Sequence, residues 1–198
     1  MTVLGGACTT SYAAVQPNMA KVEERKARKT QLPGERVGRS VTQAFELYNE
    51  EKVDEALQVL LEIRGGNDFD NAFLARFIGN LYAQKDPKQA IKYLEQATKP
   101  DVLSFADQSS SLKLVADLQS MENMHREAIK NYESWLRFTG ENDADVYLRI
   151  ANAYYQLQDY QKVLVPIDNA IRYAREPNKQ HYMLKMGALY ESKNYPKT

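Results

Sequence analysis

From residue 40 to the end of the chain, hydrophobic residues recur every three or four positions in a series of segments that turn-forming residues separate. Such spacing places the hydrophobic side chains on one face of an α-helix. Near their starts, four segments carry a small residue followed by an aliphatic one, at Ala56-Leu57, Ala90-Ile91, Ala128-Ile129 and Val163-Leu164. A matching helical segment precedes each of them. The pattern therefore predicts pairs of amphipathic helices and an all-α fold.

These helix pairs repeat at a nearly constant interval. The positions Ala56, Ala90, Ala128 and Val163 are separated by 34, 38 and 35 residues. A period near 34 with two helices in each unit is typical of the tetratricopeptide repeat (TPR). The small side chains allow the two helices of a pair to approach closely, while aromatic residues fill the space between units.

Residues 40–198 resemble the TPR family, most clearly in Asn152-Ala153-Tyr154-Tyr155 followed by Asp159-Tyr160. The resemblance implies a TPR-type α-solenoid of antiparallel helix pairs, with about four hairpins and a terminal helix, wound into a right-handed superhelix. The expected repeat units cover about 40–66, 70–99, 104–139 and 144–176, with an incomplete unit at 179–198.

Turn residues lie where this period places the starts of second helices. Asp86-Pro87 predicts an N-cap and a first-turn proline, and Asp159 predicts a cap in front of Tyr160. Pro166 departs from the pattern because it lies beyond the first turn of its helix. Its missing donor and its ring clash cost about 3 kcal/mol inside a helix, so we expect a bend there.

The first fourteen residues are uncharged and rich in small side chains, unlike the rest of the chain. Ser11-Tyr12-Ala13 matches the small-x-small pattern before a signal-peptidase cleavage site, although a basic start and a long apolar stretch are missing. We interpret 1–14 as the remnant of a signal peptide, which predicts a periplasmic protein that begins near Ala14. Two alternatives stay open, a lipid anchor at Cys8 and a terminus without a targeting function.

Residues 15–39 carry seven basic and three acidic side chains, whereas residues 40–198 carry 19 basic and 23 acidic ones. Short charged stretches with few large apolar residues are usually solvated tethers, so we expect a basic flexible arm on a mildly acidic body. An alternative is an arm that docks on an acidic partner or an anionic lipid. The whole chain has no net charge and no run of eighteen apolar residues, which argues against a nucleic-acid partner and a spanning membrane segment.

Motifs that carry chemistry are missing from the sequence. Gly65-Gly66 lacks the Lys and Ser or Thr that follow in a phosphate-binding loop. One cysteine, Cys8, and two distant histidines, His125 and His181, cannot form a zinc cage. Trp135 and the thirteen tyrosines could form a stacking platform for single-stranded nucleic acid, but the acidic body argues against it. The sequence thus predicts a protein without enzyme activity, cofactor or metal.

Recognition in TPR arrays takes place on the concave face, which the first helix of each unit lines. Lys113, Arg149 and Asn152 could form part of a clamp for a peptide carboxylate, but Asp117 would repel that carboxylate. We therefore expect a mixed polar and aromatic groove for an extended or helical polypeptide segment. Aligning the units places nine residues on this face: Tyr48, Arg76, Tyr82, Lys113, Asp117, Arg149, Asn152, Tyr155 and Tyr190.

The export signal, the charged segment Val22-Glu-Glu-Arg-Lys26 and loose repeats with Leu118, Ala128 and Trp135 resemble the periplasmic TPR proteins of TonB energy-transduction systems. This resemblance implies an interaction scaffold that contacts a TonB, ExbB and ExbD type complex. A cytoplasmic TPR adaptor or co-chaperone is the alternative, and a catalytic or ligand-transport role supported by the array is another. We also expect self-association through the uncapped terminal helix.

Overall fold

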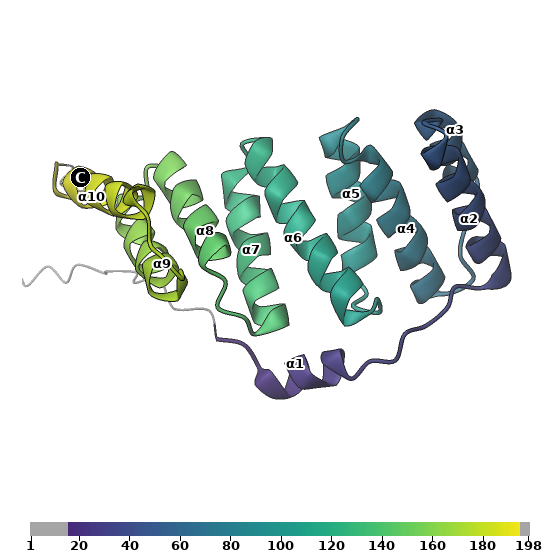
Figure 1. The fold of residues 1–198 in the computed structure, drawn as a ribbon, viewed down its shortest axis with the longest axis horizontal. Coiled ribbons are helices and arrows are strands. Elements are labelled where there is room, and N and C mark those ends of the chain that lie inside the picture. The colour runs from purple at the N-terminus through teal and green to yellow at the C-terminus, as the bar shows by residue number, and fades with distance from the viewer. Residues whose placement is uncertain (1–15, 195–198) are drawn as a thin grey trace, which may run out of the picture. The chain divides into compact units, whose positions relative to one another are not determined.

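Helices account for every regular element in residues 16–194, the part of the chain that the computed structural model describes (Figure 1). These residues belong to two compact units, Pro17–Glu141 and a second unit whose described part comprises Gln16 and residues 142–194. The expectations about the signal-peptide remnant at 1–14 and about Cys8 lie outside the described residues.

Within each unit, consecutive helices pack as antiparallel hairpins, as the repeat period predicts. The first unit contains three hairpins: α2 (Glu35–Asn49) with α3 (Val53–Leu61), α4 (Asp68–Tyr82) with α5 (Pro87–Thr98), and α6 (Phe105–Met121) with α7 (His125–Thr139). The second unit contains the hairpin of α8 (Ala144–Gln156) with α9 (Tyr160–Tyr173), and α10 (Lys179–Asn194), which packs on α9. Four hairpins and a terminal helix are confirmed for the described residues.

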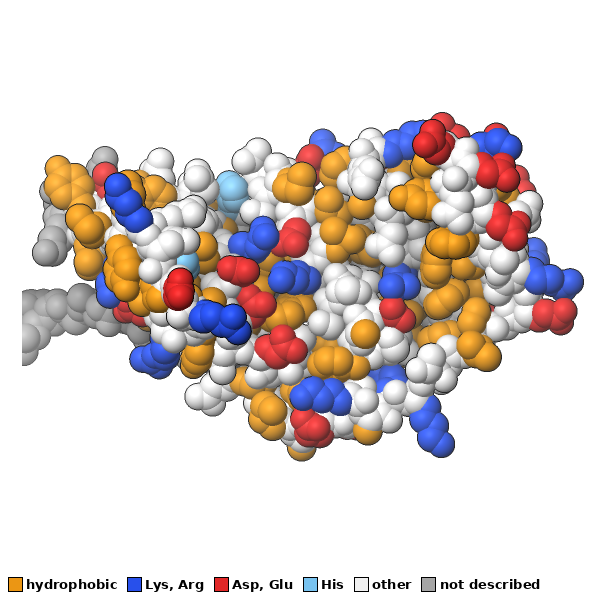
Figure 2. Space-filling view, in the orientation of Figure 1, with side chains coloured by type: hydrophobic (Ala, Val, Ile, Leu, Met, Phe, Trp, Pro, Cys, Tyr) orange, Lys and Arg blue, Asp and Glu red, His pale blue; other side chains and the backbone are white. Residues whose placement is uncertain are grey.

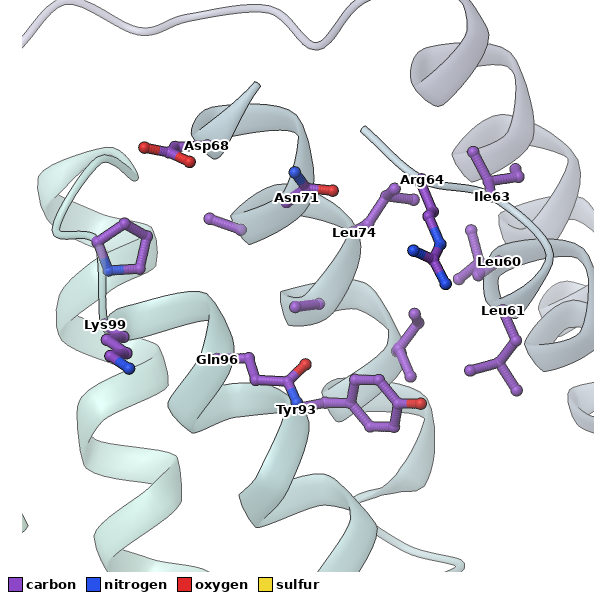
Figure 3. Close-up of a pocket in the computed structure, with 14 residues that line it drawn as sticks. Leu60, Leu61, Ile63, Arg64, Asp68, Asn71, Leu74, Tyr93, Gln96 and Lys99 are labelled. Carbon is purple, nitrogen blue, oxygen red and sulfur yellow. The ribbon is translucent and has the colours of Figure 1, made fainter. Parts of the chain in front are cut away.

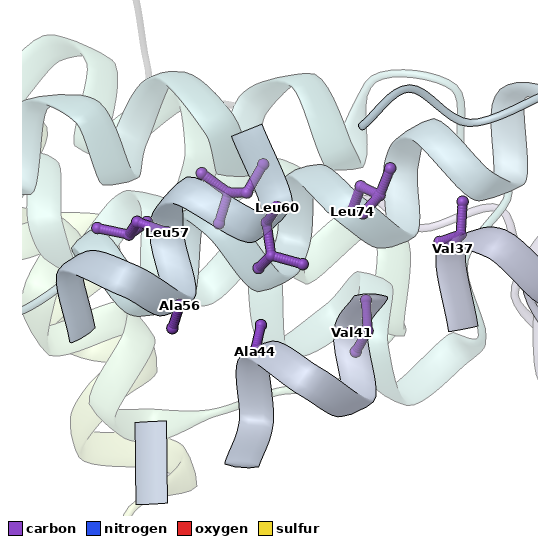
Figure 4. Close-up of a cluster of buried hydrophobic side chains, with 8 residues drawn as sticks. Val37, Val41, Ala44, Ala56, Leu57, Leu60 and Leu74 are labelled. Carbon is purple, nitrogen blue, oxygen red and sulfur yellow. The ribbon is translucent and has the colours of Figure 1, made fainter. Parts of the chain in front are cut away.

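Small residues sit where two helices of a hairpin come closest. Gly79 of α4 lies so near α5 that a Cβ atom there would be 2.6 Å from Cγ of Leu94. Ala90 and Ala128 are fully buried in their hairpins. The first hairpin and α4 share a core of aliphatic side chains, which includes Val37, Val41, Ala44, Ala56, Leu57, Leu60 and Leu74 (Figure 4).

Capping interactions agree with the sequence at one predicted helix start and differ at another. The Asp86 carboxylate accepts hydrogen bonds from the backbone N–H groups of Lys88 and Gln89, and Pro87 is the first residue of α5. Asp159 precedes α9 but makes no capping bond, because its carboxylate instead accepts a hydrogen bond from Nζ of Lys162 at 2.6 Å. Helix α9 continues through Pro166, which is buried.

The expectation of a flexible arm at 15–39 needs correction. Residues 35–39 are the first turn of α2, and α1 (Met19–Lys26) is a docked helix in which Val22 is fully buried. We refer to residues 17–34 as the N-terminal strap. In the first unit, its helix lies beside the ends of α6 and α7 (Figure 1), where Met19 approaches Gly140 at the end of α7.

Specific polar contacts explain why a basic segment docks. Nε and Nη2 of Arg25 donate to one Asp101 oxygen at 3.0 and 2.7 Å. Arg28 donates to the backbone oxygen of Leu103 at 2.6 Å and to Asp101 at 3.2 Å. The Arg25 guanidinium also lies 4.5 Å from the ring centre of Phe138. Both arginines thus contact the Asp101 carboxylate, while Arg25 also contacts an aromatic face and Arg28 also donates to a carbonyl group. These contacts offset the hydration that the two cations lose on docking.

Candidate polypeptide-binding site

All nine candidate site residues lie on the first helix of a hairpin or on the terminal helix. The first unit contains Tyr48 on α2, Arg76 and Tyr82 on α4, and Lys113 and Asp117 on α6. The second unit contains Arg149, Asn152 and Tyr155 on α8, and Tyr190 on α10. Their binding of a polypeptide stays a prediction.

Arg76 is held at the junction of two hairpins. Its Nη2 lies 2.7 Å from an Asp107 oxygen of α6, and its guanidinium lies 5.8 Å from the ring centre of Phe77. Nε of Arg76 is shielded from water and has no hydrogen-bond partner among the described residues. Arg76 is therefore a cation held in place by Asp107, with one buried N–H group that lacks a partner among the described residues.

The polar candidates on α6 help to hold this helix against α7. Asp117 accepts a hydrogen bond of 2.6 Å from the hydroxyl of Tyr132, whose side chain is fully buried. The ammonium group of Lys113 lies 5.5 Å from the ring of Trp135, whose indole N–H donates to Ser109 at 3.0 Å. These contacts give Lys113 and Asp117 a structural role in the hairpin.

The two tyrosine candidates of the first unit have different surroundings. Tyr82 stacks on Tyr93 of α5, with ring centres 5.8 Å apart and planes inclined by 10°. Tyr48 is 45% exposed and lines an apolar pocket of about 210 Å³ between α2 and α4. The lining residues are Ala44, Phe45, Tyr48, Leu60, Phe77, Asn80 and Leu81.

Of the residues that line this pocket, the sequence-based candidates include only Tyr48, and Phe45 and Asn80 are among those that were missed. Phe45 precedes Tyr48 by three residues, which places both side chains on one helix face, so the local spacing could have identified it. Asn80 lies on α4, and only the packing of α4 against α2 brings it to the pocket.

In the second unit, the candidates divide into a packed tyrosine and surface residues. The Tyr155 ring meets Tyr160 edge to face at 5.2 Å. Its hydroxyl lies only 3.2 Å from where a Cβ atom at Gly187 of α10 would be, so a glycine suits this contact. Arg149 is exposed, Asn152 is half-buried, and Tyr190 is 67% exposed. Surface access thus favours Arg149 and Tyr190 over Tyr155 as ligand contacts.

Features of other site classes are scarce in the described residues. Residues 16–194 bring together no group of three His, Cys, Asp or Glu side chains that could hold a metal ion. No helix in this range has the length and apolar character to cross a membrane.

Burial raises the pKa of the Tyr147 hydroxyl above its ordinary value, with a smaller contribution from Tyr173, and this hydroxyl donates to Asn142 at 3.2 Å.

The sequence matches no protein-family model and no curated protein. Solved structures do share its fold. MamA from Desulfovibrio magneticus RS-1, solved from residue 41 onward, superposes with a TM-score of 0.61 at 15% identity, covering 82% of this chain and 94% of that one. YrrB, described as a TPR protein with an unusual peptide-binding site, has a TM-score of 0.55 at 19% identity, covering 79% and 74%.

At these identities the likeness concerns the fold alone. It agrees with the repeat period, the hairpins and the small residues at helix contacts. The chain therefore has a TPR-like helical repeat fold.

Proposed function

We propose that this protein is a non-enzymatic scaffold that binds a polypeptide segment along the face formed by the first helices. The apolar pocket between α2 and α4 is the observation that carries the proposal. Its volume of about 210 Å³ is below the 300–1,000 Å³ typical of small-molecule sites and suits one large apolar side chain. Asn80, which lines the pocket beside its apolar residues, offers an amide group to a backbone group of the segment.

Binding to a partner isolated by crosslinking in cells tests this proposal. Phe45 and Tyr48 are exposed, so Phe45→Glu/Tyr48→Glu should leave the fold intact while placing two charges at the pocket. We expect a loss of affinity of at least about tenfold, as for a central apolar anchor. Met121→Glu, at another exposed position of the first unit, is the matched control. Equal affinity of the double variant and the control would refute the proposal.

The surface residues of α8 form a second proposed contact. Arg149 and Asn152 are three residues apart on one helix, so charge and amide groups share a strip. Arg149→Ala/Asn152→Ala should weaken binding more than Lys21→Glu/Lys29→Glu, which reverses two exposed charges of the N-terminal strap without removing Val22. The opposite ranking at moderate salt would make the strap the recognition element.

We further propose that the protein acts in the periplasm as an accessory of a TonB, ExbB and ExbD type complex. The small-residue segment at 1–14 and the resemblance to periplasmic TPR proteins support this location. N-terminal sequencing of the protein from its cells should find a start near Ala14, and TonB-complex components should crosslink to it. An intact Met1 in a cytoplasmic pool would instead favour a cytoplasmic TPR adaptor.

A further inference from the structure

The face formed by the second helices contains a groove because α3 is short. With 9 residues, α3 extends about 14 Å, whereas α5 with 12 and α7 with 15 extend about 18 and 22 Å. After Leu61, the chain turns through Gly65, where a Cβ atom would lie 2.4 Å from that of Asp70. The space beside α4 that a longer α3 would fill is a groove of about 790 Å³ (Figure 3).

The floor and walls of this groove are mostly apolar. Ala72, Leu74, Ala75 and Ile78 of α4 form the floor and are only 2–7% exposed. Figure 3 shows Leu61 and Ile63 to the right of Leu74 and the ring of Tyr93 below it. Leu61 is 44% exposed, so the wall offers apolar area that a ligand would cover. Burying such area provides about 25 cal/mol for each Å².

Two basic side chains, Arg64 and Lys99, stand at the rim. Both are exposed, and neither forms an ion pair with another described residue. Lys88 and Lys92 extend the positive charge along α5, where the carboxylate of Glu95 accepts a hydrogen bond from Gln119. This local excess contrasts with residues 40–198 as a whole, which contain more acidic than basic side chains.

We propose that the groove binds an acidic polypeptide segment that inserts an aliphatic or aromatic anchor between α3 and α5. Its apolar floor fits the anchor, and the basic rim fits carboxylates on either side of it. The lining includes a single aromatic ring, Tyr93, which makes a stacked nucleic-acid ligand a poor fit. Asp68, the acidic residue of the lining, disfavours a second negative group at its end of the groove.

This groove and the Tyr48 pocket are separate sites within the first unit. Leu60 borders both, but the groove is lined by residues of α3, α4 and α5, whereas the pocket lies between α2 and α4. The inference goes beyond the proposed function, since a ligand could occupy either site without the other. Variants at the two sites therefore test the two proposals separately.

Fluorescence anisotropy with a labelled synthetic peptide tests the groove. The probe contains two leucines and a phenylalanine flanked by glutamates, and two matched peptides replace either the glutamates by lysine or the apolar residues by serine. We expect the probe to bind at low salt, and both matched peptides to bind at least about tenfold more weakly. Raising the salt to about 0.5 M should weaken probe binding, because it screens exposed charges.

Two variants locate the bound probe. Arg64→Glu/Lys99→Glu should reduce affinity about tenfold, because both rim charges are reversed. Arg126→Glu/Lys130→Glu reverses two exposed charges on α7 and is the matched control, with an expected change below about twofold. Leu61→Ser, which trims the exposed wall, should also weaken binding. Circular dichroism of each variant verifies that the helices are retained.

Three outcomes would overturn the inference. One is a failure of the probe to bind at millimolar concentration. Another is equal affinity for the lysine-substituted peptide, since the rim would then select no charge. The third is a loss of affinity in Phe45→Glu/Tyr48→Glu without a loss in Arg64→Glu/Lys99→Glu, which would place the probe on the first-helix face and leave the proposed function standing.

Discussion

The N-terminal strap and the terminal helix α10 differ in how far their hydrophobic side chains are buried. The strap has few of them, yet Val22 is fully buried against the first unit. In the second unit, α10 carries a stripe of large side chains that reach the surface (Figure 2). The stripe consists of Tyr182, Met183, Met186, Leu189 and Tyr190.

The difference shows that hydrophobic content alone does not decide whether a segment docks. The strap meets a surface that matches it residue by residue, with Asp101 for two arginines and Phe138 for a guanidinium. One side of α10 also finds a matching surface, where Ala188 is fully buried and Lys185 pairs with Asp168 at 2.6 Å. On its other side, no described residue covers the stripe fully. Complementarity of charge and shape therefore matters more than apolar area.

Val22→Asp should have the largest effect on the contrast between the strap and α10, because it acts directly on the docking of the strap. A carboxylate placed without a partner in a fully buried site costs several kcal/mol, so we expect the strap to detach or the first unit to lose about 3 kcal/mol of stability. Urea denaturation measures the loss, and faster trypsin cleavage at Arg25 and Lys26 reports detachment. Ala20→Asp, at an exposed position of the same helix, is the control. Equal behaviour of the two variants would contradict the docked strap.

Asp101→Asn should destabilise the protein less than Val22→Asp, and it tests the contribution of the negative charge alone. Asp101 has a positive φ of 50°, a conformation that asparagine tolerates, so this change keeps the backbone and removes the anion shared by Arg25 and Arg28. We expect a loss of about 1–2 kcal/mol in urea denaturation, since the pair is only partly buried. Added salt should reduce the difference between the variant and the wild type.

Asp54→Asn offers a matched control for this prediction. Asp54 pairs with Lys85, but its side chain is 81% exposed. An exposed pair contributes about 0–1 kcal/mol, so the control should lose less stability than Asp101→Asn. A control loss as large as that of Asp101→Asn would mean that the strap contacts add nothing beyond an ordinary surface pair.

The hairpins could be predicted from the sequence because their determinants are local. A small residue next to an aliphatic one recurs with the repeat period, and Asp86-Pro87 carries its own capping chemistry within four residues. The docked strap could not be predicted in this way. Arg25 and Asp101 are 76 residues apart, and nothing in the sequence around Arg25 distinguishes a paired arginine from a solvated one.

The same distinction applies to the candidate site. The period places Arg76 and Asp117 on first helices, but it cannot reveal that Asp107 and Tyr132 are their partners. Which candidates pack and which stay accessible depends on these side-chain contacts between helices. In the sequence, Gly65-Gly66 lacks the residues of a phosphate-binding loop and indicates no other role, whereas in the structure the backbone N–H of Gly65 donates to Asn71 at 2.9 Å in the loop after the first hairpin.

The smallest effect on stability is expected at the stripe of α10. Met186→Glu/Tyr190→Glu changes two side chains that are mostly exposed, so the free energy of unfolding should change by no more than about 0.5 kcal/mol. Ala188→Glu, on the packed side of the same helix, should be far more destabilising, and it verifies that the assay reports on α10.

If the stripe mediates self-association, sedimentation of the wild type should depend on concentration, whereas the double variant should sediment as a monomer. Unchanged sedimentation would refute self-association through α10. A large loss of stability in the double variant would instead show that the stripe is packed within its own chain, and the contrast with the strap would disappear.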